Sequence, residues 1–443
     1  MAKRLFILGI LFTLIAANVN AQKTWTIYDC VNYAVQNNLN LGKSKLQNEI
    51  NRENYNQSIR SLLPSAGINA GSGLYFGKTV DPTTYDFVDR QFFSANYSIG
   101  GSVDLFNGFS QLNAISFNKL NYLAGQEESN QQKNEIAFQV LTNYFDVLFY
   151  KGLLKIALEQ KELSELNLER ARKMFDTGLN SKSDLLEMES RMAAEELYVV
   201  QTQNLLTSAL LNLRQNMNYS GTEELVLDEN LEINEIGLFG TDKDSVYNQA
   251  LRTNPGVKAV NLRKSAAEKN LSIAKGYLYP SLTASGGYST NYASAKGDNN
   301  TVPLKDQFNN NASQSVSVSL RIPIFYSWNN RSQIKRAKLG LLQSQADVDI
   351  AKQQIFQEIE RNFNDLSALS AEYGQMVKQW EASKIAYQAA EKKLAQGLID
   401  PIDFYDSKNL MAQGESNVLR TKLQYELKKR TINFFIGIPI YSE

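Results

Sequence analysis

Two long stretches without proline restrict what this chain can fold into more than any other feature. Proline is absent from residues 83–254 and 324–400, and glycine is sparse between residues 109 and 177 and between residues 328 and 396. Apolar side chains recur there at steps of three and four, which is typical of an amphipathic helix; examples are Ile136, Val140, Tyr144, Val147, Leu154 and Leu158. Each stretch predicts one helix of about 68 residues, about 100 Å long. Such a helix needs other helices packed along its length.

The chain also repeats one plan. SLLPSAGINAG around Pro64 matches GYLYPSLTASGG around Pro280 at an offset of 216 residues, and later matches, up to the Gly-Leu pairs at Gly178 and Gly397, keep an offset of 219. A spacing that stays fixed over the long helical stretch indicates a rigid element whose end is level in both copies. The sequence therefore predicts two tandem copies of one unit.

Each long helix is predicted to end in a tight hairpin, at TGLNSKSDLLEMESR and at QGLIDPIDFYDSKNL. Gly178 and Gly397 stand where a left-handed C-terminal cap is favoured. Ser181 with Asp184 then starts one return helix, and the run Asp400–Asp403 supplies an N-cap, a first-turn proline and an acidic third residue for the other. The return helices are predicted over 181–217 and 401–436, about half the length of the outgoing ones, and helices over 40–60 and 257–276 fill the other half.

Between the helices lie stretches with a period of two, which is typical of strands. FSANYSIGGSVDLF and SQSVSVSLRIPI alternate apolar with small or polar residues, and weaker partners precede them. Their predicted apolar positions are Ile68, Ala70, Leu74, Phe76, Phe93, Ala95, Tyr97, Ile99, Val103, Leu105, Leu282, Ala284, Tyr288, Tyr292, Val316, Val318, Leu320, Ile322 and Ile324. The loops 77–91 and 294–311 are polar. A soluble sheet with one solvated face gives the same alternation, but strands of 10–14 residues also fit a transmembrane barrel.

Four strands cannot close a barrel alone, because a barrel needs about eight or more. Open strand edges are not tolerated in lipid, so two or three subunits would have to share one barrel. The pattern does not choose between eight and twelve strands.

Composition excludes several function classes. The 46 basic and 46 acidic residues balance, which disfavours nucleic acid, and there is no histidine and a single cysteine, Cys30. A catalytic site, a metal centre and an internal disulfide are therefore not expected. Lys3 and Arg4 precede an apolar run and a small-residue cleavage site, so residues 1–21 are predicted to be a secretory signal peptide. No later apolar run is long enough to form a membrane-spanning helix.

In this arrangement the sequence resembles the TolC family of outer-membrane efflux and secretion channels, from about Trp25 to Gly437. The most specific matches are FDTGLNSKSDLLEMESR and LAQGLIDPIDFYDSKN, which follow the long helices in register. The resemblance implies a mainly α, α+β chain that forms a homotrimer, with four strands per chain in one twelve-stranded barrel in the outer membrane and a helical barrel in the periplasm. It also implies a periplasmic adaptor protein and an inner-membrane pump as partners, and no cofactor.

The implied organisation has five parts. A signal peptide (1–21) precedes the first repeat (22–219), an equatorial linker (220–243), the second repeat (244–436) and a short tail (437–443).

The resemblance also implies site residues. Asp403 and Asp406 match the acidic rings that line the closed periplasmic end, while Ser183 and Asp184 match polar residues that hold the inner helix pair. Asp403 and Asp184 could instead serve only as helix caps, and Asp406 could lie on a solvated face. The basic residue of the family's closing ion pair is replaced by Ile399, so another group must take its place.

The hairpin tips are the second implied site. Gly178, Leu179, Gly397 and Leu398 are candidates for docking the adaptor, although a helix C-cap with its hydrophobic contact explains the same residues. The resulting prediction is a passive exit duct without catalysis. An exported coiled-coil protein that spaces or anchors the envelope remains the alternative. Drug efflux and protein secretion are both compatible with the sequence, and the lack of soft ligands argues mildly against dedicated soft-metal export.

Overall fold

The computed structural model describes residues 24–438 apart from 81–84, 90, 180, 222–224, 230–235, 237–239, 241 and 297–301. The predicted signal peptide, much of the equatorial linker and most of the tail lie outside the described residues. Backbone contacts divide the chain into two compact units. The helical unit comprises Met1–Lys45, Glu128–Val257 and Ala351–Glu443, and the sheet unit comprises Leu46–Glu127 and Lys258–Ile350.

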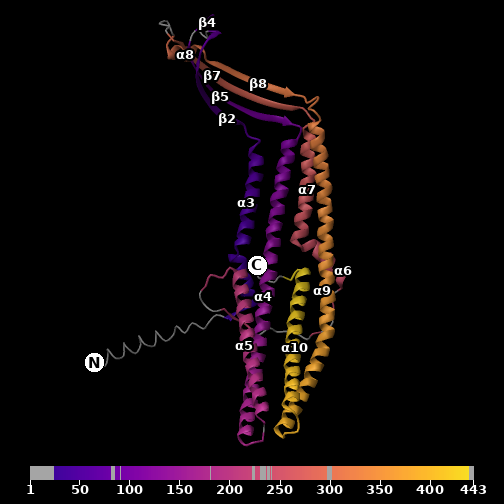
Figure 1. Ribbon diagram of the computed structural model, residues 1–443. Coiled ribbons are helices and arrows are strands. Elements are labelled where there is room, and N and C mark those ends of the chain that lie inside the picture. The colour runs from indigo at the N-terminus through magenta and orange to yellow at the C-terminus, as the bar shows by residue number, and fades with distance from the viewer. Residues whose placement is uncertain are drawn as a thin grey trace, which may run out of the picture. The chain divides into compact units, whose positions relative to one another are not determined.

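The helices follow the predicted repeat (Figure 1). The two long helices, α4 (Ser110–Asp176) and α9 (Asn329–Ala395), have 67 residues each, and both their first and their last residues are 219 positions apart. The predicted rigid element of constant length is therefore confirmed. Four shorter helices also lie close to the predicted ranges; they are α3 (Leu39–Arg60), α5 (Lys182–Met217), α7 (Pro255–Gly276) and α10 (Pro401–Phe435). Helix α2 (Ile27–Asn37) precedes α3, and helix α6 (Lys243–Thr253) precedes α7.

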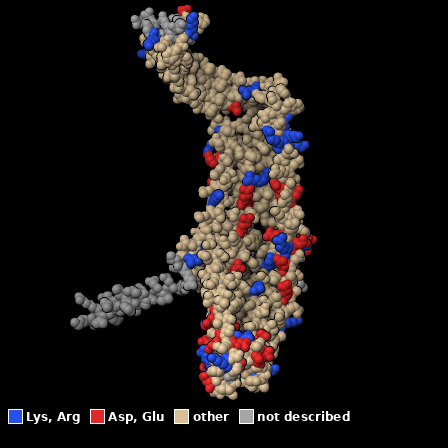
Figure 2. Space-filling view, in the orientation of Figure 1, with Lys and Arg blue, Asp and Glu red and all other residues tan. Residues whose placement is uncertain are grey.

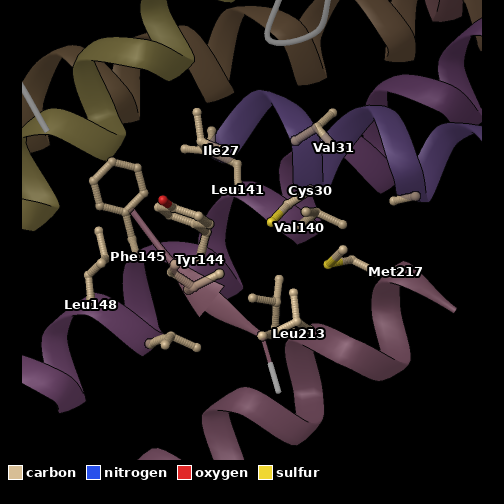
Figure 3. Close-up of a cluster of buried hydrophobic side chains, with 14 of the residues drawn as sticks. Ile27, Cys30, Val31, Val140, Leu141, Tyr144, Phe145, Leu148, Leu213 and Met217 are labelled. Carbon is tan, nitrogen blue, oxygen red and sulfur yellow. The ribbon is translucent and has the colours of Figure 1, made fainter. Parts of the chain in front are cut away.

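Among the described residues, three apolar clusters hold the helical unit together. The largest joins α2, α4 and α5, and Figure 3 shows Cys30 and Val31 of α2 near Val140 of α4. Beside it, β1 (Thr24–Trp25) pairs in parallel with β6 (Val226–Leu227). The hydroxyl of Tyr144 donates to the carbonyl oxygen of Asp228 at 2.7 Å, so this buried phenol fixes the short sheet to α4. Burial raises the pKa of Tyr144 and keeps the phenol a hydrogen-bond donor.

The sheet unit contains a four-stranded antiparallel sheet in the order β2-β5-β7-β8 (Figure 1). Its strands are β2 (Ser65–Tyr75), β5 (Phe92–Asn107), β7 (Ser281–Ala295) and β8 (Ser313–Arg321). The register places Ile68 opposite Ile99 and Ile99 opposite Tyr288, so the predicted apolar positions share one face. Many of these side chains are exposed, and Val316 is 91% exposed. Ala95 is buried on the same face, and the Phe308 ring of the segment after β7 packs on Tyr97 with ring centres 5.6 Å apart. The chain therefore carries an apolar sheet face that is largely exposed.

Two sequence predictions in this unit are wrong. The alternation predicts that the last strand includes Ile322 and Ile324, but β8 ends at Arg321, because Pro323 has no backbone N–H to donate to a ladder. The two connecting segments predicted as polar loops contain regular elements; these are β3 (Lys78–Val80), β4 (Phe87–Asp89) and the short helix α8 (Leu304–Asn310).

Helix α8 covers the part of β7 that extends beyond β8. The side-chain amide of Gln307, which is only 3% exposed, accepts a hydrogen bond from the Ala293 backbone nitrogen at 2.9 Å and donates to the Ala293 carbonyl at 2.7 Å. Asn311 donates to the carbonyl of Asn291 at 2.8 Å. Two side-chain amides thus replace the missing neighbouring strand and satisfy a free β7 edge.

Candidate functional site

The candidate site is the end of the helical unit where α4 turns into α5 and α9 turns into α10. Gly178 has φ +74° and Gly397 has φ +69°, and both are left-handed as predicted. In each turn the glycine N–H donates to a carbonyl three residues earlier, and the leucine N–H that follows donates to one five residues earlier, at 2.8–3.0 Å. These paired bonds are a Schellman cap, which explains why both turns carry glycine.

The side chains of the two leucines in these turns stay exposed, although their backbone N–H groups take part in the caps. Leu179 is 74% exposed and Leu398 is 67% exposed, whereas a cap contact alone would cover the side chain. Each tip therefore presents one large apolar side chain to its surroundings. This arrangement is compatible with the predicted docking role.

The return helices start with side-chain caps. The Ser181 hydroxyl accepts from the Asp184 N–H at 3.2 Å, and the Asp184 carboxylate accepts from the Ser181 N–H at 3.1 Å, which is a complete capping box. Asp184 is therefore committed to the cap, and Ser183 beside it is exposed. Among the hydrogen bonds of the described residues, neither connects α5 to α10.

The second copy uses a different cap. Asp400 accepts from the Ile402 N–H at 2.7 Å, and Pro401 occupies the first turn. Asp403 and Asp406 are exposed, and within the described part of the chain neither carboxylate has a hydrogen bond or an ion pair. Because they are three residues apart, they lie on one face of α10, away from the buried Phe404. Among the described residues, the Asp403 carboxylate thus accepts no hydrogen bond that would cap the start of α10.

Beneath these residues, an apolar cluster joins all four helices of the tip. Its buried members are Ala171, Met188, Tyr387, Ala390, Phe404, Tyr405 and Met411. Ile399 packs against this cluster, so the position where the resemblance would place a basic residue contributes to the hydrophobic contact.

One charged residue lies inside this apolar region. The side chain of Lys408 has no exposed surface, and its ammonium donates to the Ser164 hydroxyl at 2.6 Å and to the Glu195 carboxylate at 2.7 Å. Ser164 belongs to α4, Glu195 to α5 and Lys408 to α10. A buried ion pair therefore ties the second hairpin to the first.

Further polar groups extend this contact into a network. The Lys408 ammonium lies 5.4 Å from the centre of the Tyr405 ring, and the Arg191 guanidinium lies over the same ring at 4.6 Å. Glu187 in turn accepts from Arg191 at 2.8 Å. We call Ser164, Glu187, Arg191, Glu195, Tyr405 and Lys408 the tip network.

Burial alters the protonation equilibria of this region. Desolvation lowers the pKa of Lys408, although the hydrogen bond and charge of Glu195 act in the opposite direction. Burial also raises the pKa of the Tyr405 phenol. Further along α10, desolvation together with the nearby Glu159 raises the pKa of Glu415.

Lys408 is not among the residues predicted for the site, although the sequence carries a signal for it. Phe404, Lys408 and Met411 follow the apolar spacing of a buried helix face, so a lysine occupies a core position there. A partner of opposite charge was needed, but Glu195 lies 213 residues away in the sequence. Nothing in the local pattern of α5 distinguishes Glu195 from its exposed acidic neighbours.

The described residues carry no grouping of acidic and cysteine side chains that could hold a metal ion. Nor does any helix among them have the length and apolar character needed to cross a membrane.

Comparisons with known proteins agree with this architecture. The sequence is 22% identical to the outer membrane protein TolC of Vibrio cholerae over 438 residues, which cover 98% of this chain and 94% of the relative. The fold matches the open-state MtrE outer membrane channel of Neisseria gonorrhoeae with a TM-score of 0.76 at 18% identity, covering 94% of this chain and 89% of that one. CusC, crystallised in a study of transmembrane channel formation, matches with a TM-score of 0.78 at 17% identity, covering 95% and 93%.

A match to a family model assigns the chain to a protein family. The model described as outer membrane efflux protein matches residues 30–218 and 246–437, which are most of the two repeats and leave out the linker between them. The chain therefore belongs to the outer membrane efflux protein family, and it is an outer-membrane protein whose helices extend into the periplasm.

Proposed function

We propose that the protein is the outer-membrane exit duct of a tripartite efflux or type I secretion system. The observation that carries this proposal is the four-stranded sheet with its exposed apolar face and with β2 and β8 as its outer strands. One chain cannot close such a sheet, and in lipid the outer strands of neighbouring subunits must pair. Three copies would give twelve strands and place the apolar face against lipid.

The same symmetry supports an acidic gate at the periplasmic end. Asp403 and Asp406 are exposed on one face of α10, so three chains would bring six carboxylates around one axis. Like charges in a narrow opening favour cations and repel one another. Ser183, exposed at the start of α5, and Asp184, within its cap, remain candidates for contacts with a neighbouring chain.

The tip network supplies the contact that would hold the gate closed. With Ile399 in place of a basic residue, the Lys408–Glu195 pair is the ion pair that joins the two hairpins among the described residues. We propose that opening requires α10 to leave this partner, and that the adaptor provides the free energy by docking on the exposed Leu179 and Leu398. No catalytic step is part of this function, because the inner-membrane pump would supply the energy.

The relatives are named both for efflux and for secretion, among them the outer membrane efflux protein BepC of Brucella suis and the alkaline protease secretion protein AprF of Pseudomonas aeruginosa. We therefore propose that the inner-membrane pump selects the cargo, and that the duct itself does not.

Single-channel conductance in planar bilayers tests the proposal. Wild-type protein should show a small, cation-selective conductance, and Asp403→Ala/Asp406→Ala should lose most of that selectivity and conduct more. Asp176→Ala, in the last turn of α4, serves as the control for removing an acidic residue from a tip. A large conductance in all variants would keep the duct and remove the two aspartates from the gate. No conductance from folded, inserted protein would favour the envelope spacer instead.

A further inference from the structure

The start of α9 combines features that the duct does not explain. Between residues 307 and 346 the chain has five basic residues and no acidic one. Four of the five, Arg331, Lys335, Arg336 and Lys338, lie in the first three turns of α9 and are exposed. We call these four residues the basic patch. Figure 2 shows blue atoms gathered over this end of α9.

Three residues of the basic patch lie along one face of α9. Arg331, Lys335 and Lys338 are four and three residues apart, so they form one stripe, whereas Ala337 faces inward and is 8% exposed. Within the described part of the chain, none of the four makes an ion pair. Their charges are therefore not needed to hold this unit together.

The basic patch continues directly from an exposed apolar run. Ile324 is 95% exposed, Phe325 is 71% exposed and Trp328 is 60% exposed. The Arg331 guanidinium lies over the Trp328 ring at 4.6 Å from its centre. Along the chain, an exposed apolar strand is thus followed by exposed aromatic residues and then by exposed cations.

A local hollow lies where these features meet. It has a volume of about 130 Å³, and its walls are mostly apolar, with Trp328 and Arg331 among the lining residues. Ile324 and Phe325 of the exposed apolar run also line it.

The turn before α9 holds Trp328 outward at a conformational cost. Ser327 has φ +45° and Trp328 has φ +61°, a left-handed conformation that is rare for a bulky residue. The first repeat makes the equivalent turn with Gly108 at φ +63° and Phe109 at φ +61°. An exposed aromatic residue at this junction is therefore a feature of both copies.

The basic patch, in contrast, belongs to the second copy alone. The first 17 residues of α4 contain one basic residue, Lys119. Helices α4 and α9 have the same length and begin at equivalent positions of the two repeats. A long helix at this position therefore does not require the four basic charges in order to form.

We propose that Trp328 and the basic patch bind the phosphate groups of anionic phospholipids in the membrane leaflet on the helical side of the sheet. This inference rests on the proposed placement of the apolar sheet face in lipid. Arginine and lysine pair with phosphate, and tryptophan favours the boundary between acyl chains and headgroups. The patch spans eight residues, 331–338, which rise about 10 Å, comparable with the headgroup layer of one leaflet.

Brominated lipids test the proposal directly, because bromine quenches tryptophan only at contact. Full-length protein with Trp25→Phe and Trp380→Phe leaves Trp328 as the one fluorophore. It would be placed in phosphatidylcholine nanodiscs that contain an equal fraction of either brominated phosphatidylglycerol or brominated phosphatidylcholine. The ratio of the two quenching efficiencies measures the local preference for the anionic lipid.

We expect brominated phosphatidylglycerol to be enriched on the order of fivefold near Trp328, since one basic residue at an anionic surface contributes about that factor. Arg331→Gln/Lys335→Gln/Arg336→Gln/Lys338→Gln should bring the ratio to about one. The matched control removes four exposed lysine charges elsewhere, with Lys43→Gln/Lys45→Gln/Lys392→Gln/Lys393→Gln, and should keep the wild-type ratio. If the quadruple variant does not insert, wild-type protein in 0.5 M NaCl must show the ratio falling toward one.

A wild-type ratio near one, or a ratio that survives both the quadruple variant and high salt, would overturn the proposal. If neither lipid quenches Trp328, another surface such as a second copy of this chain covers it, and the proposal is also wrong. Conductance of the same proteins in planar bilayers separates the two proposals. Conducting protein without lipid preference would leave the duct intact, whereas protein that neither conducts nor is quenched would refute the membrane placement.

Discussion

The Lys408–Glu195 pair offers the sharpest test of how the tip is held together, because its two partners are not equally buried. The Lys408 side chain is fully buried and that of Glu195 is 16% exposed. We therefore predict an asymmetry. Glu195→Leu should destabilise the tip much more than Lys408→Met, although both remove the same ion pair.

The magnitudes follow from what each variant leaves behind. Glu195→Leu leaves a buried ammonium with only the Ser164 hydroxyl, which should cost about 3–5 kcal/mol. Proton loss sets the upper limit, because a lysine with an ordinary pKa of 10.5 can become neutral at pH 7 for about 5 kcal/mol. Lys408→Met leaves a carboxylate that reaches water, at about 1–3 kcal/mol. The double variant should lie within about 1 kcal/mol of wild type.

Hydrogen exchange of the α10 segment 404–411 in the full-length protein measures these differences as local opening free energies. Glu195→Leu should exchange about a hundred- to a few thousand-fold faster than wild type, since each tenfold corresponds to about 1.4 kcal/mol. Lys173→Met is the matched control. It breaks a Lys–Glu pair of 2.8 Å that is 74% and 63% exposed, and should change the rate by less than about threefold.

The pH dependence has a defined sign. Because the pKa of Lys408 is lowered in the folded protein, the unfolded state binds more protons between that lowered value and 10.5. Stability of the tip should therefore rise with pH within this window, and most in Glu195→Leu, where the opposing carboxylate is gone. Equal effects of the two single variants, or a double variant whose effect is their sum, would refute the unequal burial of the pair as the cause.

Three further predictions concern other described features. Gly178→Ala or Gly397→Ala should destabilise its hairpin turn by about 1–2 kcal/mol, as seen by faster exchange at the turn, whereas Gly374→Ala within helix α9, with open space around it, should stabilise the chain. Gln307→Leu should cost about 1–3 kcal/mol and expose the end of β7 to proteolysis, because it leaves the Ala293 N–H and carbonyl unpaired. Glu415→Gln should raise thermal stability at neutral pH, because the raised pKa of Glu415 makes its charged form unfavourable in the folded protein. The gain in stability should vanish as the pH falls below about 4.5, where the carboxyl group is protonated in both the folded and the unfolded state. A gain that persists at that pH would contradict the reasoning.

The repeat architecture was predictable from the sequence because it depends on local signals. Proline positions, helix period and cap residues fixed the bounds of α4 and α9 closely, and the glycines at 178 and 397 proved to be left-handed caps. These features arise from backbone sterics and from hydrogen bonds between residues a few positions apart. They do not depend on what else the chain packs against.

The tip network and α8 were not predictable, because both depend on partners distant in sequence or in register. Lys408 finds Glu195 only when α10 packs beside α5. Gln307 is useful only because β7 runs past the end of β8, and Pro323 helps to set where β8 ends. Single-sequence patterns give the type of an element, and they do not give which polar group will be buried against which.

A buried ion pair at the tip can fix the register of α10 along its neighbours, which apolar contacts alone cannot do. The cluster around Phe404 and Met411 is non-directional, so α10 could slide by one turn, about 5.4 Å, and still bury apolar area. The same slip would remove the Lys408 ammonium from Ser164 and Glu195 and leave it unpaired, at a cost of about 3–5 kcal/mol, as in Glu195→Leu. We infer that the pair sets the register of α10 more than it adds stability. On that view the double variant should be as stable as wild type while the closed conductance spreads over several levels, and a single sharp level would show that apolar packing alone fixes the register.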